Sequence, residues 1–113
     1  MEIEYNELGS GIRLIKLIGN LDIVGVNEIE IKFTGYCAGE KVRVLVDVSA
    51  VNFLASIGIR LLVTNAKSLF SRGGRMVLLN PKPDVKSTLE ITGIPDIIPM
   101  YEQLESAEAV LLG

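Results

Sequence analysis

The chain has 113 residues, of which 49% are apolar and 22% are charged, and its formal net charge is −3. This length is typical of one domain with a core of its own, and the weak acidic balance argues against binding to the phosphate backbone of a nucleic acid. The sequence contains no histidine and one cysteine, which excludes histidine-dependent catalysis, histidine-ligated zinc and a disulfide framework.

The sequence also lacks the patterns of secreted and membrane-spanning chains. Its N-terminal segment has neither a basic region nor an apolar run, so no signal peptide is expected. The most apolar window, residues 44–63, is interrupted by Asp47 and Arg60, whereas a membrane span needs about 20 mostly apolar residues. We therefore expect a cytoplasmic protein without direct membrane insertion, made of a single domain over residues 1–113 and without a metal or cofactor.

The first elements in chain order predict a β-hairpin followed by a helix. Residues 3–8 and 12–19 read as two strands on either side of a short turn at Gly9-Ser10-Gly11. Asp22 then suits the N-cap of a helix, because its carboxylate can accept a backbone N–H. The apolar residues of this helix recur at helical spacing. They are Val26, Ile29 and Phe33.

The middle of the chain predicts a buried strand and a long amphipathic helix. Residues 41–48, KVRVLVDV, are a β-branched run typical of a strand buried on both faces. The helix is predicted to begin near Ser56 and to end at Gly73-Gly74. Its predicted inner stripe is Ile59, Leu62, Val63, Ala66, Leu69 and Phe70, with Arg60, Asn65, Lys67 and Ser68 placed elsewhere.

The last third of the chain predicts four short elements. These are a strand over residues 75–80, a helix opened by Pro81 and Pro83 and stopped by Gly93, a strand over 96–101 that Pro99 interrupts, and a helix opened by Glu105 or Ser106. The resulting order, β-β-α-β-α-β-α-β-α, predicts an α/β fold with a largely parallel sheet, to which the first hairpin adds an antiparallel strand.

Ser56 has three readings on local pattern alone. The simplest is a helix N-cap, which contributes about 1 kcal/mol. A nucleophile is disfavoured, because no histidine can take its proton and neither a G-x-S-x-G nor an S-x-x-K motif is present. A regulatory phosphosite is compatible with a helix N-terminus, which tolerates negative charge. A phosphate would add a charge of about −1.5 to −2 and disrupt a partner interface centred there.

Other polar side chains give weaker signals. Asp22 and Asp47 are read more simply as cap or turn residues than as functional acids, although Asp47 ends a predicted strand. Cys37 is predicted to be a packed thiol, and Arg72 and Arg75 are predicted to be solvated. The glycines form no phosphate-binding loop, which disfavours a nucleotide-binding enzyme.

Four motifs, in order, resemble the STAS domain, the sulfate transporter and anti-sigma factor antagonist family, over nearly the whole chain. They are Gly19–Asp22 for the family's G-x-L-D loop, Asp47-Val48-Ser49 for the end of a strand, Phe53–Ile59 for the central serine motif, and the segment from RGGRMVLLNP to PMYEQLESA. The resemblance implies a STAS-type mixed sheet, built from an N-terminal hairpin and parallel strands and packed with about four helices. It also implies a protein-binding switch rather than an enzyme.

The resemblance further implies that Ser56 is phosphorylated by an anti-sigma factor that is also an ATP-dependent serine kinase. The unphosphorylated form would hold this partner, phosphorylation would release it, and a PP2C-type phosphatase would reset the switch. The partner-binding residues carried over by the resemblance are Asp22, Leu54, Ala55, Ser56, Ile57, Gly58 and Arg60.

Two residues next to Ser56 depart from the family pattern. Ala55 stands where the family has an aspartate, and Ile57 stands where it has serine or threonine. These apolar neighbours favour an alternative: a phosphorylation-independent STAS scaffold subunit of a signalling complex or of a lipid-transport ABC system. An exposed Ile57 or Leu61 would also support a weak homodimer.

Overall fold

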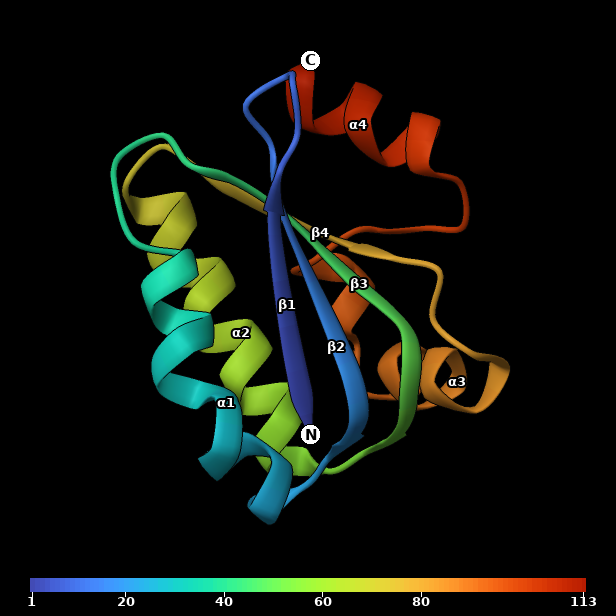
Figure 1. The fold of residues 1–113 in the computed structure, drawn as a ribbon. Helices are drawn as coiled ribbons and strands as arrows, with labels where there is room; N and C mark the ends of the chain where they lie inside the picture. Colours follow the sequence, from blue (N-terminus) through green and yellow to red (C-terminus); the bar gives the residue numbers. More distant parts are fainter.

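The computed structural model describes residues 1–113, which form a five-stranded sheet with helices on both of its faces (Figure 1). The strands are β1 (Glu2–Glu7), β2 (Arg13–Leu21), β3 (Arg43–Leu54), β4 (Arg75–Leu79) and β5 (Met100–Tyr101). The helices are α1 (Ile23–Tyr36), α2 (Ser56–Ser71), α3 (Pro83–Ile91) and α4 (Leu104–Leu112), with a 3-10 turn, η1 (Ile94–Asp96), before β5. The predicted α/β order and the four helices are confirmed.

The sheet is mixed, as the predicted hairpin requires. Its strands lie in the order β1-β2-β3-β4-β5. β1 runs antiparallel to β2, and every other neighbouring pair is parallel. Because β2 and β3 are parallel and pair up to their last residues, Leu21 opposite Leu54, the helices that follow them begin next to each other.

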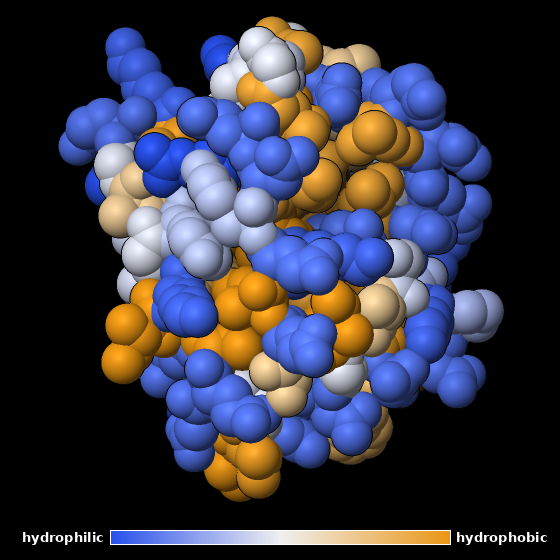
Figure 2. Space-filling view, viewed as in Figure 1, coloured by the Kyte–Doolittle hydropathy of each residue, from blue (hydrophilic) through white to orange (hydrophobic).

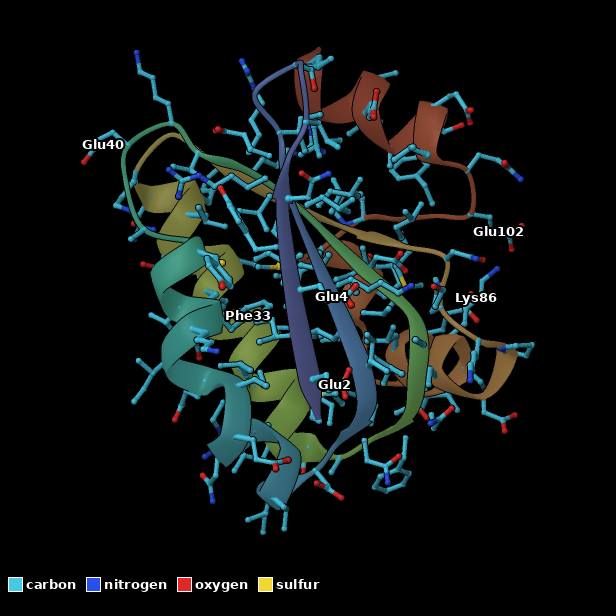
Figure 3. The ribbon with its side chains drawn as sticks, viewed as in Figure 1. Glu2, Glu4, Phe33, Glu40, Lys86 and Glu102 are labelled. Carbon is cyan, nitrogen blue, oxygen red and sulfur yellow. The ribbon has the colours of Figure 1, made fainter.

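The two faces of the sheet are covered by different helices. α1 and α2 lie on one face and α4 lies on the other (Figure 1). Phe33, labelled in Figure 3, is fully buried on α1 within the larger core. Val44 and Val46 of β3 belong to that core, whereas Leu45 belongs to the smaller core beneath α4. The prediction that this strand is buried on both faces is therefore confirmed, and each such side chain contributes about 1.5–3 kcal/mol.

β3 is longer than predicted. The strand expected over residues 41–48 continues to Leu54, because its pairing with β2 continues to Leu21 despite two irregularities in the register. Asp47 therefore lies within the strand and not at its end, where functional loops gather. Its carboxylate accepts a hydrogen bond from the backbone N–H of Ser49 at 2.9 Å.

The buried face of α2 is rotated relative to the predicted stripe. Phe70 was predicted to face the core but is 79% exposed, whereas Leu61 and Asn65 are buried. α1 packs against α2 on this side. The buried amide of Asn65 is satisfied, because its Nδ2 donates to the carbonyl oxygen of Leu61 at 3.0 Å. A polar residue can thus occupy an inner helix position when it bonds to its own helix.

Two C-terminal predictions need correction at their boundaries. The strand expected over residues 96–101 is reduced to β5, because the end of η1 and the turn that follows it occupy residues 96–98 and Pro99 has no N–H to donate to a ladder. α4 begins at Leu104, slightly earlier than predicted. None of the helices has the length and hydrophobicity to cross a membrane.

Arg72 was predicted to be solvated, but its side chain anchors the chain segment that follows α1. Its guanidinium donates to the carbonyl oxygens of Gly39 and Cys37, both at 2.8 Å. Cys37 is buried, as predicted. Burial raises the pKa of its thiol to about 12, although the charges of Arg72 and Arg13 act in the opposite direction, so the thiol is protonated at neutral pH.

Candidate functional site

The N-termini of α1 and α2 lie side by side at the carboxyl end of the parallel strands (Figure 1). Leu21 ends β2 and directly precedes Asp22, while Ala55 directly precedes Ser56. The backbone N–H of Ala55 donates to the carbonyl oxygen of Leu21 at 3.1 Å. This bond joins the two loops that carry the predicted site residues.

Two glycines allow this close approach. A Cβ on Gly58 would lie 2.6 Å from the carbonyl oxygen of Leu21, and a Cβ on Gly25 would lie 1.9 Å from that of Asn20. Neither position can accept a side chain unless the backbone shifts. Gly58, which the resemblance assigned to partner binding, is buried and has a packing role at the start of α2.

Asp22 is the N-cap of α1, as predicted. Its Oδ1 accepts a hydrogen bond from the backbone N–H of Gly25 at 2.8 Å, which satisfies one of the free donors in the first turn of the helix. The carboxylate is half-buried, so it remains reachable from the surface that α1 and α2 share.

Ser56 is the first residue of α2 and not its N-cap, so this prediction is wrong. Ala55 occupies the N-cap with extended backbone (φ −92°, ψ 168°) and has no side chain that can cap. The reason is the extension of β3 to Leu54, which moves the strand-to-helix transition onto Ala55. The side chain of Ser56 is exposed. It stands at a helix end whose free N–H groups and dipole favour negative charge.

The other predicted partner-binding residues divide between surface and core. Arg60 is exposed, and Asp22, Ala55 and Ile57 are half-buried. Leu54 is only 7% exposed and belongs to the larger core, so its side chain supports the site from beneath. Leu61 is 5% exposed, which corrects the expectation that it could support a homodimer.

Sequence reasoning missed three exposed apolar side chains beside these residues. Ile23 and Val24 in the first turn of α1 are 63% and 66% exposed, and Phe53 near the end of β3 is 55% exposed. Figure 2 shows apolar atoms protruding at the lower end of the molecule, where α1 begins. No sequence signal marked Phe53, because strict alternation would place it on the same face as the buried Val51, and the irregular pairing of β2 with β3 at this point breaks that alternation.

The arrangement is an exposed hydroxyl at a helix N-terminus, beside a capping carboxylate and three exposed apolar side chains. We call this surface the Ser56 surface and define it as Asp22, Ile23, Val24, Phe53, Ala55, Ser56, Ile57 and Arg60. Exposed apolar side chains of this kind, gathered next to polar groups, are typical of surfaces that contact other proteins.

Comparison with known proteins agrees with this architecture. The model of the STAS domain family matches residues 6–107, and the chain belongs to this family. Among curated proteins, BtrV of Bordetella bronchiseptica, described as an anti-sigma factor antagonist, is 27% identical over 88% of this chain and 85% of its own. An anti-sigma F factor antagonist of Lysinibacillus sphaericus is 27% identical over 72% of this chain and 70% of its own.

A solved structure shows the same fold. The anti-sigma factor antagonist SpoIIAA of Bacillus, in its unphosphorylated form, superimposes with a TM-score of 0.77 at 23% identity and with 96% of each chain covered. The predicted STAS fold is thereby confirmed. Both curated relatives described above are named as anti-sigma factor antagonists, and the same fold also occurs in a part of the murine anion transporter Slc26a9, with a TM-score of 0.76 at 15% identity over 89% of this chain and 18% of the transporter chain.

Proposed function

We propose that this protein is an anti-sigma factor antagonist that works in the cytoplasm as a phosphorylation-controlled binding switch and not as an enzyme. Its unphosphorylated form binds an anti-sigma factor that is also an ATP-dependent serine kinase. The observation that carries the proposal is the exposed Ser56 at the start of α2, with Ile23, Val24 and Phe53 exposed nearby.

The switching step would be a phosphoryl transfer from ATP held by the kinase. The Ser56 Oγ attacks the γ-phosphorus, the bond from that phosphorus to the bridging oxygen breaks, ADP leaves, and the hydroxyl proton passes to a base of the kinase. The product carries about −1.5 to −2 charges beside apolar side chains. Burying that charge against a partner is costly, so the complex dissociates, and a PP2C-type phosphatase restores the hydroxyl by hydrolysis.

Two facts support this reading. SpoIIAA, which shares the fold, has been solved in both a phosphorylated and an unphosphorylated form. Moreover, Ser56 makes no capping bond that a phosphate would break. Modification at this position therefore leaves α2 and the larger core intact.

The proposal is tested by incubating the protein with ATP and its cognate anti-sigma factor and locating the phosphate by mass spectrometry. We expect phosphate on Ser56, and we expect Ser56→Asp to bind the anti-sigma factor more weakly than the wild type. Ser56→Ala is the matched control and should bind like the wild type without being modified. If Ser56 stays unmodified and Ser56→Asp binds as well as the wild type, the switch is wrong.

A second candidate is a phosphorylation-independent scaffold subunit of a signalling complex or of a lipid-transport ABC system. The apolar neighbours Ala55 and Ile57, both half-buried at the surface, favour it, because they make the site a contact patch. Affinity purification from cells distinguishes the two candidates: transporter subunits without a kinase indicate the scaffold, and an anti-sigma kinase indicates the switch.

A further inference from the structure

We infer that Arg60 is the residue that binds the phosphate once Ser56 carries it, an inference that rests on the proposed function. Ser56 is the first residue of α2 and Arg60 follows four positions later on the same helix. Both side chains are exposed. Residues separated by four positions are neighbours on a helix surface, about 5–6 Å apart at Cβ.

The direction of the helix favours this pair. Side chains on a helix lean toward its N-terminus, so a residue covers the surface over the turn that precedes it. A side chain at position 60 can therefore reach the turn that carries Ser56. An anionic group four positions before a cationic group is also the stronger of the two orders on a helix surface, and here the anion stands at the N-terminus, where the helix dipole favours it.

Arg60 has no partner that would compete. Its guanidinium takes part in neither of the two ion pairs of the structure, which join the N-terminal amine to Glu28 and Lys86 to Glu102. Glu30 of α1 lines the same groove as Arg60, a cavity of about 310 Å³ between α1 and α2, but forms no ion pair with it. The carboxylate of Asp22 accepts the N–H of Gly25 and forms no ion pair with Arg60.

The chemistry of the guanidinium suits the ligand. Its planar fork can donate two parallel hydrogen bonds to phosphate oxygens, which a lysine ammonium cannot do. The bound phosphate would draw Arg60 toward Ser56 and away from the groove lined by Glu30. Phosphorylation would thus change the Ser56 surface at two positions. It would add an anion at Ser56, and it would make Arg60 unavailable to a partner protein.

The test uses full-length protein in which phosphoserine is incorporated at position 56 during translation, and measures the second pKa of the phosphate by phosphorus NMR. A bound guanidinium favours the dianion, so this pKa should be lower in the wild type than in Arg60→Gln, by about 0.3 pH units for an exposed pair. Arg60→Lys should fall between the two. Asp22 and Glu30 are present in every variant, so their opposing charges cancel in the comparison.

Lys67→Gln is the matched control. Lys67 is an exposed cation on α2, eleven residues after Ser56 and therefore about 16 Å away, and its loss should leave the phosphate pKa at the wild-type value. An equal pKa in the wild type and Arg60→Gln, or an equal shift in Lys67→Gln, overturns the inference. Because no kinase takes part, this result is independent of whether an anti-sigma kinase modifies Ser56.

Discussion

At the scale of single residues, the site depends on a glycine that the fold cannot replace. A Cβ at Gly58 would approach the carbonyl oxygen and the Cγ of Leu21 to 2.6 and 2.7 Å. We predict that Gly58→Ala lowers the free energy of unfolding by about 1–3 kcal/mol, because a well-packed position has no room for an added methyl group. This loss should exceed the gain of about 1 kcal/mol that alanine normally brings to a helix.

Gly35 provides the control for this prediction. It lies in α1, and a Cβ there would meet nothing within 4 Å. Gly35→Ala should therefore stabilise the protein by up to about 1 kcal/mol. Urea unfolding of both variants decides the question. A change in the free energy of unfolding of the same sign and size in both variants would show that contact with Leu21 is not what makes Gly58 necessary.

At the scale of elements, the two helices at the site begin in different ways. α1 is capped by the Asp22 carboxylate, whereas the N-cap of α2 is Ala55, which has no capping group. We predict that Asp22→Ala costs about 1 kcal/mol of unfolding free energy, and that Ser56→Ala costs less than about 0.5 kcal/mol. Thermal unfolding monitored by circular dichroism measures both. A loss in Ser56→Ala equal to that in Asp22→Ala would mean that Ser56 does cap α2.

The same pair of helices shows what the sequence could and could not reveal. The cap at Asp22 was predictable, because an aspartate directly precedes a helical stripe and its bond to Gly25 is local. The start of α2 near Ser56 was also predicted correctly, but its N-cap was not, because Ala55 is held at that position by a bond to Leu21, which is far away in the chain. Strand length, and with it the position of Ser56, follows from pairing between β2 and β3 rather than from local propensity.

Helix orientation was likewise only partly predictable. The periodicity of α2 correctly identified Leu62, Ala66 and Leu69 as buried. It placed Asn65 outside the buried face and Phe70 inside it, and both placements were wrong, because they were based on the hydrophobicity of the side chain alone. The packing of α1 against α2 determines that side, and a stripe drawn from one helix does not contain this information. The order of strands and helices, in contrast, follows directly from the alternating pattern.

At the scale of the whole molecule, the Ser56 surface lies at one end of the fold, and another exposed aromatic side chain lies far from it. Phe53 is 55% exposed beside the start of α2, and Phe70 is 79% exposed near the end of that helix. If the Ser56 surface binds the anti-sigma factor, only the first phenylalanine is buried in the complex. Phe53→Ala should then weaken binding by about 30-fold, as the loss of a buried aromatic anchor costs about 2 kcal/mol.

Phe70→Ala removes a phenylalanine side chain that is more exposed than that of Phe53. This variant should bind the cognate anti-sigma factor like the wild type. Neither substitution should change stability by more than about 0.5 kcal/mol, since both rings lie largely in solvent. Isothermal titration of the three proteins with the unphosphorylated partner gives the comparison. Equal affinities in Phe53→Ala and the wild type, or an equal loss in Phe70→Ala, would place the interface away from the carboxyl ends of β2 and β3, and Ser56 would then lie outside the surface it is proposed to control.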